Sequence, residues 1–293
     1  MLTVVIVHWN QPNACIETVR LFAADPLVTR VIVVDNGSKA EAVSDLRHQA
    51  DSEHLDAEVQ LIEIGHNSGF GPGVNRGWES WLSDTSGTEW VAVAPHDAQP
   101  QAGALAALLA VGETTAPNGR PYGLVSADVG DAEAPFVDHV FGPITRPAST
   151  TEGVELVDYP HGTLFLASRT CLNRIGLFDE RFFSYCEEAD LGLRAKAAGF
   201  EVGLVRGARV VNPHVNSPTP LVDYLQERNT VLLVEKHFGR RRSMMRFALT
   251  IWQLARGIVQ PSSRGPYWNT KARVQAVADI PRRSWGRPPS NMT

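Results

Sequence analysis

Three acidic side chains lie within four residues, where an aromatic-rich stretch gives way to a helical pattern. Glu187, Glu188 and Asp190 follow the sequence RFFSYC and precede small and apolar residues that end at Gly199. The helix dipole favours acids at a helix start, so all three can be structural. Carboxylates crowded beside aromatic rings also repel one another, which raises at least one pKa and suits a general base or a cation site. The residue types leave both interpretations open.

Polar side chains follow each of the first four apolar runs of the chain. The runs LTVVIVH, RVIVVD, VQLIEI and WVAVAP predict buried strands, and helical patterns separate them at 12–24, 40–49 and 74–82. This alternation is typical of an α/β fold with one doubly wound, mainly parallel sheet flanked by helices. Ligands of such sheets bind beyond the carboxyl ends of the strands. The side chains expected there are His8, Asn10, Asp35, Asn36, His66, Asn67, His96 and Asp97.

The second half of the chain is less regular. We predict a helix at 102–111, a strand at 122–126, a long loop over 128–153, strands at 156–159 and 163–167, two short strands within 201–212 and a helix at 219–237. The segment 243–259 is also helical, with a narrow polar stripe on an otherwise apolar surface. Three interpretations of it remain open: peripheral membrane contact through 240–260, docking against the body of the protein, or self-association into a homodimer.

The net charge of −5 combines two unlike parts of the chain. From Lys236 onward there are twelve Lys and Arg and one acid, a net charge of +11, which leaves −16 for the preceding residues. A basic C-terminal segment indicates an anionic partner, such as a membrane surface, a lipid phosphate or nucleic acid. We expect no nucleic acid, because the basic residues lack interleaved aromatic side chains arranged as a stacking platform.

Composition excludes several other classes of protein. No apolar run reaches the roughly 20 residues of a transmembrane helix, and the N-terminus lacks the basic flank and cleavage site of a signal peptide. Cys15, Cys171 and Cys186 are too widely spaced for a disulfide framework or a zinc cluster. We expect a cytoplasmic protein with buried thiols, and a peripheral position on the inner face of the cell membrane is the alternative.

Four segments together resemble family 2 glycosyltransferases with the GT-A fold, especially the rhamnosyltransferase-like branch. They are VVIVHWNQP with VIVVDNGSK, HNSGFGPGVNRGW at 66–78, WVAVAPHDAQP at 90–100, and the stretch from His161 to Phe200 with ARVVNPH at 208–214. The resemblance implies a GT-A domain at 1–235, with a nucleotide-binding half at 1–110 and an acceptor-binding half at 111–235. After it we expect a basic amphipathic helical extension at 236–280 and a disordered tail at 281–293.

The resemblance places a nucleotide sugar against the first half of the chain. It implies that Asp35 contacts a uridine or thymidine, although DNGS can equally form an Asx-type turn. The glycines at 69, 71 and 73 let backbone approach a ligand closely, although a tight turn needs them equally. The expected contacts to the nucleotide sugar are His8, Asn10, Asp35, Asn67, Gly69, Asn75, Arg76, His96, Asp97 and Gly162.

The third segment departs from the family pattern. Such enzymes carry Asp-x-Asp or Asn-Pro-Asp where this chain has Pro95, His96 and Asp97. By resemblance, Asp97 holds a divalent cation, Mn²⁺ or Mg²⁺, that bridges the donor diphosphate, and His214 completes the metal shell. Such hard cations prefer oxygen ligands. His96 would suit Mn²⁺ better than Mg²⁺ as a ligand, and its other interpretation is a loop histidine that faces solvent.

The acidic segment carries the expected base. The family reads Glu-Asp-x-Asp here and uses the Asp of the first pair to deprotonate the acceptor hydroxyl, a position that Glu188 occupies in this chain. Asp190 and Glu187 are structural or acceptor-orienting alternatives. Gly162 begins the strand that floors the acceptor site in the family, so His161 can touch the sugar or the acceptor.

The sequence therefore predicts an inverting glycosyltransferase. The resemblance implies transfer of rhamnose from dTDP-rhamnose, or of a sugar from a UDP-sugar, to a glycan, lipid-linked or natural-product hydroxyl. A nucleotide-sugar-binding protein without turnover is the alternative, because the Pro-His-Asp and Glu-Glu sequences depart from the pattern. A sugar-nucleotide pyrophosphorylase is disfavoured, since no glycine-rich loop with a following Lys lies near the N-terminus.

Overall fold

The computed structural model describes residues 1–52, 54–84, 87–213, 219–290 and 292. Its strands are β1 (Leu2–His8), β2 (Val28–Asp35), β3 (Glu58–Glu63), β4 (Trp90–Pro95), β5 (Gln99–Pro100), β6 (Tyr122–Asp128), β7 (Glu133–Asp138), β8 (Gly142–Pro147), β9 (Val154–Leu156), β10 (Phe165–Ser168) and β11 (Glu201–Val211). Its α-helices are α1 (Pro12–Ala23), α2 (Ala40–Ser52), α3 (Phe70–Ser83), α4 (Ala104–Gly112), α5 (Arg169–Ile175), α6 (Glu187–Ala197), α7 (Thr219–Phe238), α8 (Arg240–Val259) and α9 (Thr270–Arg282).

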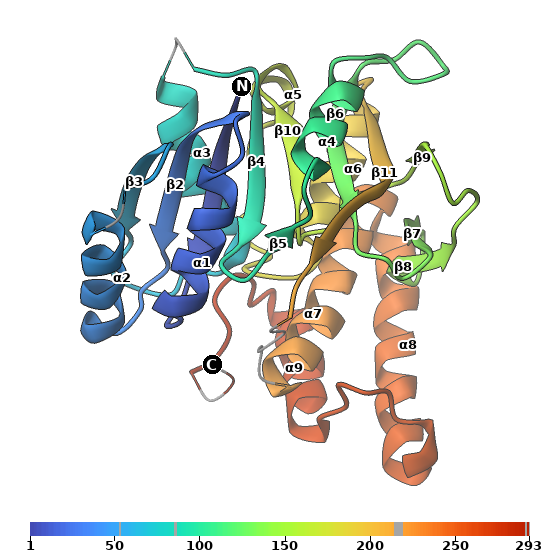
Figure 1. The fold of residues 1–293 in the computed structure, drawn as a ribbon. Coiled ribbons are helices and arrows are strands. Elements are labelled where there is room, and N and C mark those ends of the chain that lie inside the picture. Colours follow the sequence, from blue (N-terminus) through green and yellow to red (C-terminus); the bar gives the residue numbers. More distant parts are fainter. Residues whose placement is uncertain (53, 85–86, 214–218, 291, 293) are drawn as a thin grey trace.

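One sheet forms the centre of the molecule. Among the described residues it has nine strands in the order β3-β2-β1-β4-β10-β6-β11-β5, with β9 paired to β11. Strands β1 to β4 run parallel, β10 runs antiparallel between β4 and β6, and β11 is parallel to β6. Figure 1 shows helices on both sides of the sheet, with α7, α8 and α9 grouped beyond its lower edge. The predicted α/β fold with a mainly parallel sheet is confirmed.

Both faces of the sheet are buried, which explains its apolar strands. In β1, Val4 and Ile6 pack in the core that α1 and α4 cover, whereas Val5 and Val7 pack in the core that α3 and α6 cover. A strand covered on both sides reads as a continuous apolar run. Each fully buried aliphatic side chain contributes roughly 1.5–3 kcal/mol to folding. The two cores fix the carboxyl ends of β1 to β4 at one edge.

Three regions differ from the sequence-based expectations. Residues 133–147, predicted within a long loop, form the antiparallel hairpin of β7 and β8. β11 is one strand rather than two, because a register irregularity between Leu204 and Arg209 interrupts its pairing without ending the strand. α3 begins at Phe70, earlier than the expected helix start at residue 74, so the glycine-rich segment is itself helical.

The C-terminal tail is packed against the body, contrary to the disorder expected from residue 281. Arg228 of α7 is fully buried and donates hydrogen bonds to the carbonyl oxygens of Ser284 at 3.3 Å and Gly286 at 2.8 Å. Trp285 packs against the cluster that contains Phe182. The tail is polar in composition, but a buried guanidinium needs acceptors, and the backbone of the tail supplies them.

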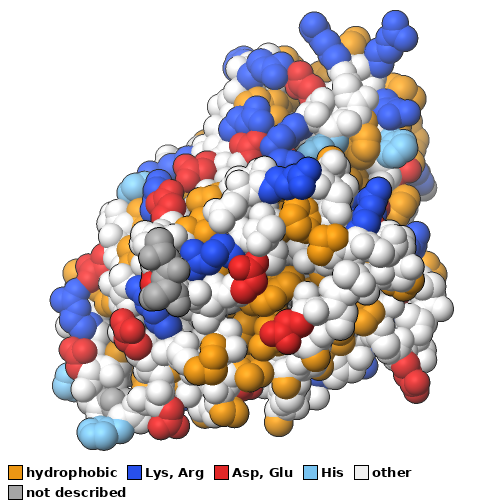
Figure 2. Space-filling view, turned by 90° about the horizontal axis from the view of Figure 1, so that it is seen from above, with side chains coloured by type: hydrophobic (Ala, Val, Ile, Leu, Met, Phe, Trp, Pro, Cys, Tyr) orange, Lys and Arg blue, Asp and Glu red, His pale blue; other side chains and the backbone are white. Residues whose placement is uncertain are grey.

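The surface shows an uneven distribution of charge. In Figure 2, Lys and Arg side chains gather toward the upper right of the view, whereas acidic side chains are more frequent toward the lower left. None of the helices that the structure describes is long and apolar enough to span a bilayer. Of the three cysteines, Cys15 and Cys171 are buried and all three are free thiols.

Candidate active site

The carboxyl ends of β1 and β2 are joined by a buried hydrogen-bonded pair. His8 Nδ1 lies 3.0 Å from Asp35 Oδ1, and His8 Nε2 accepts a hydrogen bond from the Gln11 amide at 3.1 Å. These contacts fit one neutral tautomer, with the proton on Nδ1. Burial alone would raise the pKa of Asp35, but hydrogen bonds from His8 and Ser38 outweigh it and lower that pKa. Asp35 is therefore ionised and held in place at neutral pH.

Two asparagines hold the loops that surround this pair. The Asn10 side-chain oxygen accepts a hydrogen bond from the Lys39 backbone amide at 2.8 Å, and the Asn10 backbone amide donates to Ser38 Oγ. Asn36 is 4% exposed and contacts Asn67, and its Oδ1 accepts from the Ser68 amide at 2.9 Å. The side chains of Asn10, Asn36 and Asn67 thus shape the sheet edge by bonding the protein itself.

The glycine-rich segment packs against protein at the start of α3. A Cβ on Gly69 would lie 2.1 Å from the Phe183 carbonyl oxygen, and Gly69 has a φ of +100°. The first amides of α3 are also occupied, because Phe70 donates to Ser184 Oγ and Gly71 donates to the Phe183 carbonyl. A helix N-terminus binds phosphate through such free amides. These two amides are engaged by the loop 178–186 instead.

Asn75 and Arg76 take different positions on α3. The Asn75 side chain is 3% exposed; it donates to the Phe178 carbonyl at 3.0 Å and accepts from the Phe178 amide at 2.9 Å. Arg76 lies on the outer surface, where it pairs with Glu79 at 2.7 Å. Asn75 therefore connects α3 to the loop before α6, and Arg76 also reaches that loop through an ion pair with Glu180 at 3.7 Å.

The turn between β4 and β5 carries His96 and Asp97. Thr18 of α1 donates to the carbonyl oxygen of His96 at 2.8 Å, which fixes this turn against the helix. The His96 ring stands edge-on to His8 with 5.9 Å between ring centroids, and its Nδ1 lies 3.3 Å from the Val7 carbonyl oxygen. Asp97 is 5% exposed. His214, the second expected metal ligand, lies outside the described residues.

The loop before α6 has an unusual backbone. Phe183, Tyr185 and Cys186 have φ values of 66°, 68° and 74°, a region that residues with side chains rarely adopt. Each such residue costs of order 1–3 kcal/mol and persists only when its surroundings hold it. Asn229 of α7 provides this support, because its Nδ2 lies within 2.9 Å of the carbonyl oxygens of Phe182, Ser184 and Tyr185. This strained backbone places the next two residues, Glu187 and Glu188, at the start of α6.

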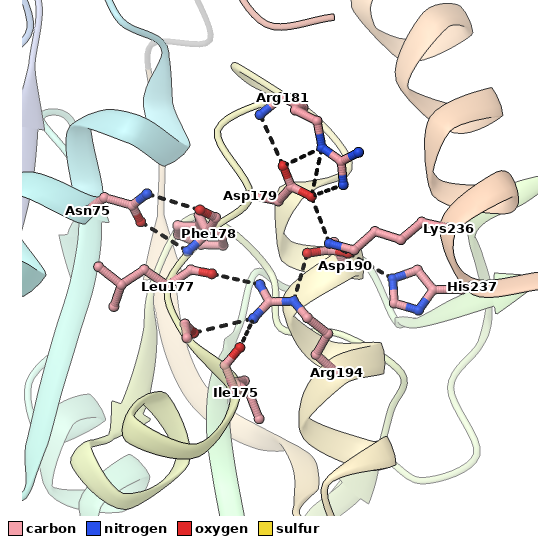
Figure 3. A network of polar contacts seen from close by, with 11 residues as sticks. Asn75, Ile175, Leu177, Phe178, Asp179, Arg181, Asp190, Arg194, Lys236 and His237 are labelled. Atoms are coloured by element: carbon pink, nitrogen blue, oxygen red, sulfur yellow. Dashed lines mark hydrogen bonds and ion pairs between the residues drawn. The ribbon is translucent and has the colours of Figure 1, made fainter.

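Asp190 is fully paired below this loop. Its carboxylate accepts from Arg194 at 2.8 Å and His237 at 2.7 Å and forms an ion pair with Lys236 at 2.6 Å, as Figure 3 shows. Burial would raise the pKa of Asp190, but these partners lower it. Arg194 also donates to the carbonyl oxygens of Ile175 and Leu177. Asp190 is thus a structural anion, the alternative role considered from the sequence.

Glu188 lies directly above Gly162. A Cβ on Gly162 would come within 2.2 Å of Glu188 Oε1. Any other residue at position 162 would therefore displace this carboxylate. Burial raises the pKa of Glu188 to about 7. A carboxyl with this pKa exchanges protons near neutral pH, which suits a general base. His161, next to Gly162, is kept neutral because burial lowers its pKa.

Glu187 is the buried neighbour of Glu188. It is 2% exposed, and no described residue lies within hydrogen-bonding distance of its Oε2. Burial and the nearby Glu188 raise the pKa of Glu187 well above its usual range. Burial and the neighbouring carboxylate therefore both favour the protonated form of Glu187.

The chain matches known glycosyltransferases. Residues 3–119 match the family model described as glycosyl transferase family 2. The chain is 28% identical over 254 residues to the N-acetylglucosaminyl-diphospho-decaprenol L-rhamnosyltransferase of Mycobacterium tuberculosis, covering 75% of this chain and 79% of that protein. It is 23% identical to the low-salt glycan biosynthesis hexosyltransferase Agl10 of Haloferax volcanii, covering 82% and 77%. The chain is a glycosyltransferase whose residues 3–119 are similar to family 2.

Solved structures show the fold of this glycosyltransferase independently. The mannosyltransferase PcManGT of Pyrobaculum calidifontis, in complex with GDP-Man and Mn²⁺, superposes with a TM-score of 0.56 at 16% identity and covers 95% of this chain and 86% of that one. GalNAc-T7 with UDP, GalNAc and Mn²⁺ gives a TM-score of 0.59 at 14% identity, with 96% and 56% coverage. The GT-A fold predicted from the sequence is confirmed.

The described residues provide part of the oxygen ligands that a divalent cation needs. Within the described part of the chain, no three His, Cys, Asp or Glu side chains converge as a metal site. Magnesium and similar ions are often held by one or two carboxylates together with substrate phosphates. Asp97, nearly buried at the carboxyl end of β4, can supply one such oxygen.

The most consequential residues that sequence reasoning missed in the enzyme are Asn229 and Arg194. Neither touches the expected substrate region directly; they hold the loop that presents Glu188. The sequence contains one indication of the role of Asn229, because this polar residue lies beside the apolar run TVLLV of a predicted helix. Such a residue needs hydrogen-bond partners when it is buried. The sequence does not say which loop provides them.

Proposed function

We propose that this enzyme is an inverting glycosyltransferase in which Glu188 is the general base. The observation that carries the proposal is the Glu188 carboxyl over Gly162, with a pKa raised to about 7. At neutral pH a substantial fraction of Glu188 is ionised and able to accept a proton. A general base contributes typically 10²- to 10⁴-fold to a rate.

The proposed reaction is a single displacement at the anomeric carbon of the donor. The acceptor hydroxyl attacks this carbon from the face opposite the diphosphate while its proton passes to a Glu188 carboxylate oxygen. The new bond joins the acceptor oxygen to the anomeric carbon, and the bond to the diphosphate oxygen breaks with its electron pair. A cation on Asp97 would neutralise charge on the departing diphosphate.

The neutral His8 and the ionised Asp35 form the expected nucleotide end of the site. We propose that this edge holds the uridine or thymidine of the donor, with its sugar toward Gly162. The similarity to an L-rhamnosyltransferase supports dTDP-rhamnose as the donor and a lipid-linked glycan as the acceptor. A UDP-sugar donor and a soluble glycan or natural-product acceptor remain the alternatives to compare in the same assay.

A two-part experiment tests this function. Thermal shift with a panel of dTDP- and UDP-sugars, with Mn²⁺, Mg²⁺ or EDTA, should single out one donor, because a bound ligand stabilises the folded state in proportion to its concentration over Kd. Turnover with that donor and a GlcNAc-diphospho-polyprenol acceptor should then release nucleoside diphosphate. Glu188→Gln should keep the thermal shift and lose about 10²- to 10⁴-fold in kcat.

The control variant for this assay is Glu79→Gln, because Glu79 is an exposed carboxylate paired with Arg76 on the outer side of α3. Its kcat should equal that of the wild type. Donor binding without turnover in the wild type would favour a nucleotide-sugar-binding protein. Full turnover in Glu188→Gln would exclude this residue as the base.

A further inference from the structure

α8 buries polar side chains, whereas an ordinary surface helix buries its apolar face. Its buried residues include Arg246, which is 6% exposed, and Thr250, which is fully buried. Both side chains contact Glu227 of α7 at 2.9 Å, and Glu227 also pairs with Arg273 of α9 at 3.0 Å. The polar stripe predicted from the sequence therefore faces inward. Charge pairing, not an apolar seam, attaches this part of α8 to α7 and α9.

The opposite face of α8 is apolar and exposed. Met244, Met245, Ile251, Trp252, Ile258 and Val259 are between 43% and 84% exposed. Their spacing places them on one side of the helix over about four turns. Ordinary surface helices turn such a face toward the core. Contiguous exposed apolar surface of this kind marks an interaction site.

The charged residues of α8 itself all have one sign. Arg240, Arg241 and Arg242 precede it and are exposed, and the exposed Arg256 lies over the Trp252 ring at 5.2 Å. α8 contains no Asp or Glu. A second copy of the chain would bring the same arginines against one another, which costs electrostatic energy. An anionic surface would neutralise them.

We propose that the outward face of α8 binds the surface of an anionic lipid bilayer. Trp252 and its aliphatic neighbours would enter the headgroup region while the arginines contact lipid phosphates, as in helices that lie in the membrane plane. Figure 1 shows α8 at the edge of the molecule, projecting away from the sheet, so a flat surface can reach it. The inference goes beyond the proposed function and does not depend on the identity of donor or acceptor.

A neighbouring cleft extends the same surface. It has a volume of about 390 Å³ and lies between α7, α8 and the end of α9. Met244 and Phe247 line it together with Trp285 and the basic Arg240. Glu235 and Arg283 line it as well and pair with each other at 3.0 Å. The apolar walls suit the lipid chemistry inferred for the helix face.

Vesicle flotation of the full chain tests the proposal. The wild type should float with vesicles of equal parts phosphatidylglycerol and phosphatidylcholine, and binding should be at least about tenfold weaker with phosphatidylcholine alone or at high salt, since juxtamembrane basic residues respond to surface potential. The double variant Trp252→Glu with Ile258→Glu should lose at least about tenfold in partitioning, because both side chains are exposed and would carry charge into the lipid.

Leu21→Glu is the matched control, because Leu21 is a 44% exposed apolar residue on α1. Leu21→Glu should float like the wild type. Leu21→Glu and the double variant should both keep the thermal shift that the donor causes in the wild type. Equal flotation of the double variant and the wild type would overturn the proposal, as would a wild type that does not float with anionic vesicles. A lipid-free dimer that the double variant dissociates, seen by analytical ultracentrifugation, would assign the face to a second copy instead.

Discussion

Two groups of buried carboxyls in this enzyme have opposite surroundings. Glu187 and Glu188, at the start of α6, have raised pKa values and no cationic partner among the described residues. Asp223 and Glu227 of α7 are more buried than Glu188, and Arg273 contacts both of them while Arg246 contacts Glu227. A buried charge destabilises the folded state unless an opposite charge pairs with it. The unpaired group next to the sheet edge therefore points to function, and the paired group holds the C-terminal helices together.

Removal of the paired acid Glu227 should have the largest effect on stability. Glu227→Ala leaves Arg246 and Arg273 without their shared carboxylate, and an unpaired buried charge typically costs about 3–5 kcal/mol. We expect urea unfolding to show a loss of this size. A matched change at the exposed pair of Arg76 and Glu79, Glu79→Ala, should cost less than about 1 kcal/mol. Equal losses would show that burial of the pair is unimportant.

The pH dependence of turnover should sharpen the role of the unpaired group. A base must be ionised to accept a proton, so kcat/KM should fall as the pH drops below the raised pKa of Glu188 at about 7. The expected decrease is about tenfold per pH unit on the acid side, hence roughly 100-fold over two units. A profile without a break near this pH would contradict the assignment of Glu188.

The same group should also affect stability, with a sign opposite to that of Glu227. Because the pKa of Glu188 is higher in the folded state, its contribution is complete below the unfolded value of 4.5 and is lost as the pH rises through about 7. Glu188→Gln should therefore be more stable than the wild type at pH 8, by roughly 2 kcal/mol after allowance for partial solvent access. At acidic pH the two proteins should unfold at the same urea concentration.

The smallest expected effect concerns the glycine beneath Glu188. Gly162→Ala would force the Glu188 carboxylate to move, because the new Cβ would lie 2.2 Å from its Oε1. A displaced base should cost about tenfold in kcat with little change in stability, since the contact involves the end of a flexible side chain. Gly265→Ala is the control, as nothing lies within 4 Å of a Cβ there. Unchanged activity in both variants would separate Gly162 from the site.

The first four strands and the sheet edge could be predicted from the sequence because their signals are local. Continuous apolar runs mark buried strands, and the polar residues after them follow from the chain direction. The sequence leaves the glycine-rich segment open between an approach to ligand and a tight turn, whereas in the structure Gly77 and Gly73 meet Val5 and Val7 of β1 and Gly69 meets Phe183. Glycines four residues apart fall on one helix face, which would have indicated close packing of α3 on the sheet.

The long-range contacts could not be predicted in this way. The polar stripe of α8 was recognised, but its inward direction depends on Glu227 and Arg273, which lie on two other helices. The support of the loop before α6 likewise depends on Asn229, more than 40 residues away. Sequence periodicity identifies a face of a helix and leaves open what covers it.

The anchoring of Arg228 by Ser284 and Gly286 has a consequence for biosynthesis of the enzyme. Arg228 is adjacent to Asn229, which holds the strained backbone in front of Glu188. During translation, Asp97, Gly162 and Glu188 leave the ribosome long before Gly286. A nascent chain that stops short of this residue contains every proposed catalytic group but lacks the last support of the loop that presents the base. Activity is thereby expected to require synthesis of the chain through Gly286.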